Sequence, residues 1–444
     1  MLAIETLKRI LRRYPALYRA MRPHVVNSVF YEMQRTRHAE QQDRHYLRLR
    51  DAYYARQRDL FSPPGYLSRS RSLLAARGVA PSTAKVSSKD VHIFVIDNNG
   101  PLGPLYLKEF DRSFDVTMFS LAAHQTAFLQ GRQPTMEELG SLEIWPNGYQ
   151  RTATLYGDWR RRLQEDLVMA VKHTHVRKPI DLVWAYVAPF DWDRNTYQTI
   201  HELGIPVAVW CLDDKHVFWD DRQFPYPQNQ RDLIDMCDIH LTNSLECLRW
   251  YIAEGSPAYY FPQAIDLELY PPAEGKPDFP VSFVGQAYGW RFKLIRGLRR
   301  AGIPIVCFGP GWENGFVGSE IDIFRRSAIN LGIGGVMASE KITCIKGRDY
   351  MIAALGRLYV TTFDYELAQH FHVGREIVCY RNEIDCVELV RYYLECPDKA
   401  QRIAQAARQR CAMDHTWTVR MQGLLRWVGI LGGPHDSDWE KMPQ

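Results

Sequence analysis

Two short stretches of the sequence carry side chains whose types and spacing suit chemistry. In the first, Asp213, Asp214 and His216 follow directly after an apolar run that ends at Leu212, with Lys215 between them. Adjacent carboxylates and an imidazole can orient or deprotonate a hydroxyl group. The alternative is a set of charges on a solvated loop. We expect this stretch to face a cleft, and Asp213, Asp214 and His216 are the candidate catalytic residues.

The second stretch places two cations, Lys346 and Arg348, around Gly347 at the expected start of a helix that begins at Asp349. A helix N-terminus carries a partial positive charge, so cations there are unfavourable unless something offsets them. Asp349 offsets part of this charge, and a bound phosphate would offset the rest. The alternative is a solvated basic turn. We treat Lys346, Gly347 and Arg348 as candidate ligands of a diphosphate.

Two further loops of the same half of the chain have a similar character. Gly285, Arg291 and Lys293 belong to an expected strand-to-helix turn, and Gly309 opens the glycine-rich loop "GPGWENG" after the next strand. Three strand ends that offer amides or cations to one edge of a sheet favour an anionic ligand. The chain has neither the dinucleotide-binding glycine pattern after a strand nor the P-loop pattern, so NAD, FAD and P-loop chemistry are unsupported.

Other polar clusters are better explained as structural. Asp191 and Asp193 resemble a metal-binding Asp-x-Asp pair, but they precede an expected helix, and capping is the preferred interpretation. Two histidine pairs are also interpreted as structural. His173 and His175 are expected on the opposite side of the sheet, and no third metal ligand is apparent for His370 and His372. We therefore predict no metal ion and no cofactor.

The elements that would position these residues alternate between buried strands and helices, which indicates parallel, doubly wound sheets. Strands are expected at 91–97, 114–121, 181–187, 205–214 and 237–244, then at 281–285, 303–309, 358–362 and 376–380. Helices are expected at 291–300, around 324–330, at 349–355, 383–394 and 415–431. Such sheets bind ligands beyond the carboxyl ends of their strands. The pattern predicts an α/β chain with two Rossmann-like domains that face each other across a cleft.

Residues 1–88 differ from the rest of the chain. They hold 17 Lys and Arg against 6 Asp and Glu, a net charge of +11, so the remaining residues carry −7 of the overall +4. Apolar residues recur there at roughly helical spacing. We divide the chain into a basic helical extension (1–88), a first domain (89–270), a second domain (271–415) and a final helical segment (416–444). The extension could bind an anionic membrane surface, bind a partner protein, or cap the first domain.

Bulk composition is that of a soluble globular protein, with 46% hydrophobic and 24% charged residues. No apolar run is long enough to span a bilayer, and the first 20 residues lack the features of a secretory signal. The nine cysteines are scattered, which is typical of free thiols in a reducing compartment. We predict a cytoplasmic protein, with peripheral contact at the inner membrane face as one role for the extension.

The second half of the chain resembles a known family. The stretches "VSFVGQAYGWR", "CFGPGW", "KGRDYMIAALG", "YELAQHF" and "GREIVCYRNEIDCVELV" are similar to the C-terminal half of group 1 glycosyltransferases of the CgeB-like branch. The resemblance covers 280–427 closely and 91–270 loosely. It implies a GT-B fold, a nucleotide-sugar donor on the second domain, an acceptor on the first and no obligatory metal. It also implies that Arg291 and 345–347 contact the donor phosphates and that Glu366 lies in the donor pocket.

One departure from the family pattern concerns its two glutamates, seven residues apart, which here are Thr343 and Met351. Methionine cannot accept a strong hydrogen bond from a ribose. We expect a metal-independent hexosyltransferase that acts on a surface glycan, a lipid-linked intermediate or a protein, without nucleic acid. A non-catalytic scaffold and a nucleotide-sugar epimerase remain alternatives.

Overall fold

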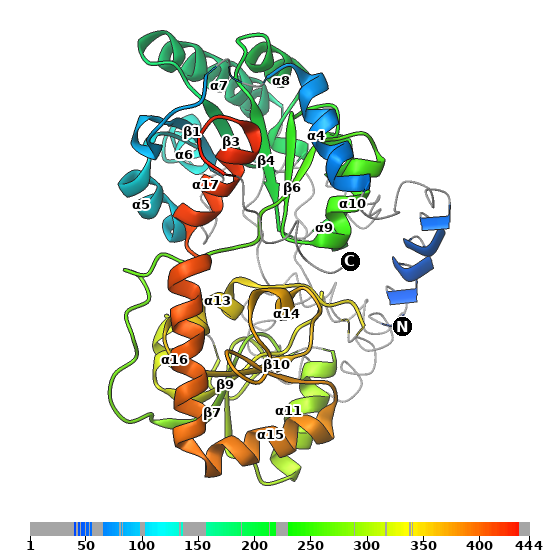
Figure 1. Ribbon diagram of the computed structural model, residues 1–444, viewed down its shortest axis with the longest axis vertical. Coiled ribbons are helices and arrows are strands. Elements are labelled where there is room, and N and C mark those ends of the chain that lie inside the picture. The colour runs from blue at the N-terminus through cyan, green and yellow to red at the C-terminus, as the bar shows by residue number, and fades with distance from the viewer. Residues whose placement is uncertain are drawn as a thin grey trace.

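The structure is a computed structural model, and it contains two parallel β-sheets with helices around them. In Figure 1 the two sheets lie one above the other along the long axis of the molecule. The residues that the structure describes are 40, 43, 44, 46–48, 50–52, 54, 55, 65–79, 81, 83–97, 103–132, 135, 157–187, 189–212, 214–218, 230–287, 289–315, 318–336, 339 and 341–434.

The first sheet has six strands in the order β2-β1-β3-β4-β5-β6, and every pairing is parallel. Except for the half-buried edge strand β2, its strands are short apolar runs that are buried on both faces, as expected for a sheet covered by crossover helices. The five predicted strands are confirmed, and a sixth of only three residues was not predicted. The strands are β1 (His92–Asp97), β2 (Asp115–Ser120), β3 (Leu182–Tyr186), β4 (Val207–Cys211), β5 (Ile239–Thr242) and β6 (Ala258–Tyr260).

Helices connect and cover these strands. The short helix α9 follows β4, so it lies at the carboxyl end of the sheet. The helices of this part are α4 (Gly65–Arg77), α5 (Gly103–Ser113), α6 (Leu121–Leu129), α7 (Asp158–Arg177), α8 (Arg194–His201), α9 (Asp214–Val217) and α10 (Leu245–Ala253), with 3-10 turns η2 (Ser88–Asp90), η3 (Pro189–Asp191) and η4 (Gln230–Leu233).

The second sheet has five parallel strands in the order β11-β10-β9-β7-β8. Its strands are β7 (Phe279–Val284), β8 (Ile305–Phe308), β9 (Ser327–Leu331), β10 (Leu358–Thr362) and β11 (Val378–Tyr380). Its helices are α11 (Trp290–Arg300), α12 (Glu320–Arg325), α13 (Gly347–Ala354), α14 (Leu367–His370), α15 (Glu383–Glu395) and α16 (Pro397–Asp414). The predicted strands and the helices at 291–300, 349–355 and 383–394 are confirmed.

The helix predicted around 324–330 is wrong, because most of this stretch is the central strand β9. Its polar residues concealed the strand pattern. Ser327 and Asn330 are fully buried, and both bond to Ser282 on the neighbouring strand β7. Asn330 also donates to the carbonyl oxygen of Phe324 at 3.0 Å. Buried polar groups with hydrogen-bond partners are tolerated in a sheet, but they do not produce an apolar run.

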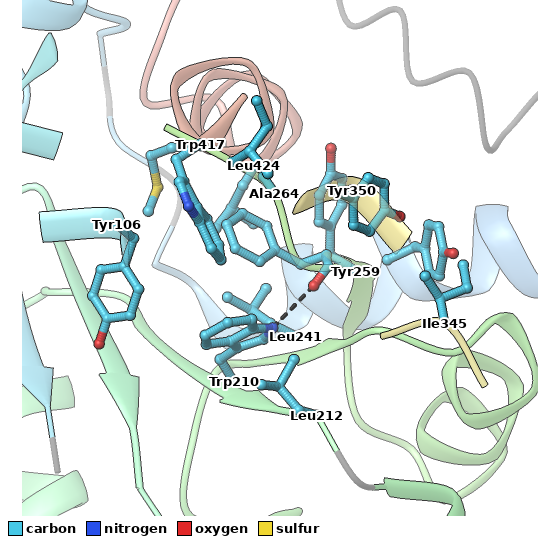
Figure 2. Packing of buried hydrophobic residues seen from close by; sticks show 14 of the residues in the cluster. Tyr106, Trp210, Leu212, Leu241, Tyr259, Ala264, Ile345, Tyr350, Trp417 and Leu424 are labelled. Atoms are coloured by element: carbon cyan, nitrogen blue, oxygen red, sulfur yellow. Dashed lines mark hydrogen bonds between the residues drawn. The ribbon is translucent and has the colours of Figure 1, made fainter. Parts of the chain in front are cut away.

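The last helix, α17 (Trp417–Val428), returns from the second sheet to the first. Figure 1 shows α16 beside the lower sheet and α17 beside β1 and β3 of the upper one. Trp417 is fully buried, with its ring 5.6 Å from that of Trp210 and 5.5 Å from that of Tyr106 (Figure 2). Glu109 of α5 accepts hydrogen bonds from the backbone amides of Trp417 and Thr418, so it caps this helix across 308 residues of sequence.

The described part of the basic extension packs against the first sheet. Helix α4 contacts α10, and Leu74 belongs to the main apolar core. Ser70 is buried and exchanges two hydrogen bonds with the backbone of Ala258, at 2.8 and 3.0 Å. Of the three roles considered for residues 1–88, the described residues favour the cap on the first domain. None of the described helices is long and apolar enough to cross a bilayer.

Candidate functional site

A cavity of about 600 Å³ separates the two sheets at their carboxyl ends. Lys215 and Glu246, from α9 and α10, reach it from the first sheet, and the segment after β10 reaches it from the second. This volume lies within the range of ligand pockets in proteins. The lining residues are Tyr46, Arg50, Lys215, Glu246, Lys341, Ile342, Thr343, Thr362, Phe363, Asp364, Tyr365, Glu366 and Arg381.

Lys215 connects the two sheets across this cavity. Its ammonium group donates to the carbonyl oxygen of Thr343 at 2.9 Å and to Glu366 Oε1 at 3.3 Å, and it lies 3.9 Å from Glu246 Oε2. Burial alone would lower the pKa of Lys215, but the carboxylates of Glu366 and Glu246 outweigh burial and raise it. Lys215 is therefore charged, and it neutralises Glu366. Lys215 belongs to the same stretch as Asp213, Asp214 and His216, but it was not one of the predicted catalytic residues.

Glu366, which the family resemblance assigns to the donor pocket, lines the cavity at the start of α14. Its Oε1 atom also accepts a hydrogen bond from the Ser244 hydroxyl at 3.1 Å. Its Oε2 atom is buried and has no hydrogen-bond partner among the described residues. Burial raises the pKa of Glu366, while Lys215 opposes that shift. The Glu366 carboxylate lines the cavity and is held by Lys215, and a carboxylate can accept a hydrogen bond from a ligand hydroxyl.

Of the three predicted catalytic residues, only Asp214 has a side chain that the structure describes. Asp214 is fully buried, and burial raises its pKa to about 7. Its carboxylate therefore does not face the cleft, which is a correction to the sequence-based expectation. Asp213 lies outside the described residues, as does the side chain of His216.

The residues predicted to bind phosphate lie at the start of α13, which begins at Gly347. Lys346 is the N-cap residue, and its backbone amide donates to Asp349 Oδ2 at 2.6 Å. Asp349 also accepts from the Tyr359 hydroxyl at 2.7 Å, and burial raises its pKa to about 6. Lys346 and Arg348 line a pocket of only about 10 Å³, next to the larger cavity. That is room for about one water, so a diphosphate would have to displace these side chains.

Gly347 packs closely against a neighbouring side chain and has no positive φ. A Cβ atom at this position would lie 2.9 Å from Gln263 Oε1, in the linker between the sheets. The glycine therefore allows the start of α13 to approach the linker closely.

The glycines after β7 and β8 pack against each other. A Cβ atom on Gly309 would lie 2.4 Å from the carbonyl oxygen of Gly285, and the Gly309 backbone has a positive φ of 117°. Arg291 is buried, and its guanidinium reaches this turn, 3.5 Å from the position of a Gly285 Cβ. Lys293 is exposed on α11 and lines neither pocket. The structure thus brings Gly285, Gly309 and Arg291 together but leaves Lys293 at the surface.

Two residues of the clusters interpreted as structural, Asp193 and His370, make structural hydrogen bonds. Asp193 caps α8 by accepting a hydrogen bond from the Thr196 amide at 2.7 Å, as predicted. His370 is buried and bonds to the Tyr260 hydroxyl at 2.9 Å. No group of His, Cys, Asp and Glu among the described residues could hold a metal ion. All nine cysteines are free, and eight of them are buried.

Part of the second half of the chain is similar to a known family. Residues 291–426 match the family model described as "Glycosyl transferase-like". Among solved structures, the chain aligns with a glycosyltransferase from Rickettsia africae at 12% identity and a TM-score of 0.51, over 77% of this chain and 98% of that one. The chain has a GT-B fold. No curated protein matches it.

Two further solved structures align more loosely with this GT-B chain. The Anabaena protein HepE in complex with UDP and glucose is 14% identical, with a TM-score of 0.49 over 77% of this chain and 100% of that one. A putative UDP-N-acetylglucosamine 2-epimerase from Listeria monocytogenes is 14% identical, with a TM-score of 0.43 over 76% and 95%. Neither similarity is close enough to support a functional argument.

Thr343 and Met351, which stand where the family pattern has two glutamates, have different surroundings in this GT-B chain. Thr343 lines the cavity, and its carbonyl oxygen accepts the hydrogen bond from Lys215. Met351 is 8% exposed and packs in the main apolar core. Glu366 therefore provides a carboxylate at the cavity where positions 343 and 351 provide none.

Proposed function

We propose that the protein is a glycosyltransferase that moves a sugar from a nucleotide diphosphate sugar to an acceptor hydroxyl. The observation that carries this proposal is the position of the glycosyl transferase-like region, 291–426, which supplies one whole wall of the interdomain cavity. That wall includes a buried carboxylate with an unused oxygen, on Glu366. A cavity of this kind, with few polar groups fixed by their neighbours, suits a sugar ligand.

The donor would bind to the second domain. Lys346, Arg348 and Arg291 would neutralise the charge that develops on the leaving diphosphate, which is the main electrostatic demand of the reaction. Gly285, Gly309 and Gly347 allow close approach of the backbone at the same edge of the sheet. This part of the proposal follows from the helix start of α13 and from the cluster of glycines.

The donor sugar would lie between this diphosphate and the first domain. The Glu366 carboxylate would accept a hydrogen bond from one of its hydroxyls, with Lys215 fixing the carboxylate. Asp213 and His216 stay as candidates for orienting or deprotonating the acceptor. Asp214 is not a candidate, because its carboxylate is buried.

The finer assignment is hexosyl transfer without a metal ion, in the cytoplasm, to a glycan, a lipid-linked intermediate or a protein. The test is a thermal-shift screen of the full chain against nucleotide diphosphates and their sugars, followed by a transfer assay. We expect one nucleotide class to raise the melting temperature and Glu366→Gln to abolish transfer with little loss of nucleotide binding. Isomerisation of the sugar without acceptor would instead indicate an epimerase.

A second candidate function is a non-catalytic scaffold. The burial of Met351 in the apolar core favours it, since the position that binds ribose in related enzymes has no polar group here. The screen separates the two functions. A chain that no nucleotide sugar stabilises would be the scaffold.

A further inference from the structure

Tyr46, Arg50 and Tyr54 recur every four residues in a helical stretch near the N-terminus, so they share one face of that helix. This face is fixed to the first domain. The Tyr54 hydroxyl donates to Glu246 Oε1 at 3.1 Å and accepts from Trp250 Nε1 at 3.3 Å. The ring of Tyr46 packs 6.1 Å from that of Trp250. The stretch is therefore a packed part of the molecule on α10.

The same face forms one wall of the interdomain cavity. Tyr46 and Arg50 line it beside Lys215 and Glu246 of the first domain. The opposite wall, which carries Glu366, belongs to the second domain, where the proposed donor would bind. The wall of Tyr46 and Arg50 faces the proposed donor across the cavity, on the side where the acceptor would bind.

The acids that line the cavity are already engaged by protein groups. Glu246 is paired with Tyr54 and Lys215, as described above. Asp364 is buried and accepts hydrogen bonds from the backbone amides of Glu366 and Leu367, at 2.7 and 3.1 Å. These acids therefore offer little free negative charge to a ligand.

The cations of the lining are more accessible. Lys341 and Arg381 are exposed, and the Arg50 side chain is 33% exposed. Arg50 donates to Asp51, whose side chain is itself 68% exposed, so solvent screens this pair. The Arg50 guanidinium also lies 3.9 Å from Glu246 Oε1, a distance too long for a hydrogen bond. A ligand anion can compete for such a guanidinium, which binds carboxylates and phosphates in two-pronged geometry. The open polar groups of the cavity thus favour a ligand with negative charge.

We propose that the wall formed by Tyr46 and Arg50 is the acceptor subsite, and that it selects a carbohydrate that carries a carboxylate or a phosphate. This inference rests on the proposed function. It assigns part of the basic extension to the substrate site, and it names a class of acceptor.

The test is a ligand-observed NMR titration of the full chain with glucuronic acid, glucose 6-phosphate and glucose. We expect at least one anionic sugar to bind the wild-type chain at least fivefold more tightly than glucose, with an affinity that falls as salt rises. The affinities for glucuronic acid and glucose 6-phosphate show whether the subsite prefers a carboxylate or a phosphate. Arg50→Ala should remove the preference and Arg50→Lys should keep part of it. Arg44→Ala, an exposed arginine of the same stretch, should leave it unchanged.

Three results would overturn the inference: equal affinity for glucose and both anionic sugars, no binding of either anionic sugar, or the same preference in wild type and Arg50→Ala. A parallel UDP titration and a melting curve show whether each variant is folded. If folding is lost in Arg50→Ala, the comparison is made with Arg50→Gln. Failure of every nucleotide to bind would count against the proposed function alone, because the sugar titration needs no donor.

Discussion

Lys215 and Glu366, which are 151 residues apart in the sequence, form an ion pair of 3.3 Å between the two domains of the GT-B fold. Both side chains are only about 10% exposed. Removing one member of a buried pair leaves the other charged and unpaired, which costs about 3–5 kcal/mol. Replacing both members by uncharged residues leaves no unpaired buried charge, so it should lower the free energy of unfolding by less.

Lys215→Met should therefore lower the free energy of unfolding by about 3–5 kcal/mol, whereas Lys215→Met with Glu366→Gln should recover much of this loss. Urea denaturation of the single and double variants measures both values. Arg161→Ala, which breaks an exposed pair with Glu165, is the control, with an expected loss below about 1 kcal/mol. Equal losses in the single and double variants would show that the pair is not coupled.

Nucleotide binding should depend on the cations at the start of α13. Lys346→Ala and Arg348→Ala should each weaken UDP binding about tenfold, because each removes a charge-assisted contact to phosphate. Isothermal titration calorimetry at low and high salt measures this, and the effect should shrink as salt rises. Arg300→Ala, at the exposed end of α11, should bind UDP as the wild type does. Unchanged affinity in both α13 variants would place the diphosphate elsewhere.

Stability should fall with rising pH because of Asp214. Its pKa is about 7 in the folded state, above the ordinary value of 3.8. Between about pH 4 and pH 7 the carboxyl group is therefore protonated in the folded chain and ionised in the unfolded chain, so stability falls as the pH rises through this range. Asp214→Asn should match the wild type near pH 4 and exceed its melting temperature at pH 8. Glu388→Gln, an exposed position on α15, should shift neither value. A wild-type melting temperature that rises from pH 4 to pH 8 in step with the variant would contradict this assignment.

Attachment of α17 to the first domain should depend on Trp417. Trp417→Ala removes a fully buried ring and should destabilise the protein by about 3–5 kcal/mol, with loss of near-UV circular dichroism. Val419→Ala, a 39% exposed position on the same helix, should cost about 0.5 kcal/mol or less. If the two variants unfold at the same urea concentration, the aromatic cluster does not hold the helix in place.

The alternation of apolar strands and helices was enough to predict both sheets, because buried parallel strands are short apolar runs. It failed at β9, where Ser327 and Asn330 are buried in a central strand but satisfied by Ser282. A sequence pattern indicates a buried strand only when the buried residues are apolar. A buried strand whose polar side chains are hydrogen-bonded therefore cannot be predicted in this way.

The site was predicted only in part, for a different reason. Neighbouring residues on a helix point about 100° apart, so α9 buries Asp214 and directs Lys215 toward the second domain. The sequence motif therefore contains the residue that lines the cavity, Lys215, but its Asp214 carboxylate does not face the cleft as predicted. The partner of Lys215, Glu366, belongs to the other domain, and no local pattern relates the two. The face of Tyr46 and Arg50 has helical spacing, but its place at the cavity depends on contacts with α10.

The position of Trp417 also sets the order in which the chain can fold during synthesis. The core of the first domain includes Trp210 and Phe261, yet the ring that packs on both is made 156 residues after Phe261. At about 5–20 residues per second, a ribosome needs roughly 8–30 s to make that interval. During this time the aromatic surface of the first domain is uncovered, and it is a candidate binding surface for a chaperone until the end of the chain emerges.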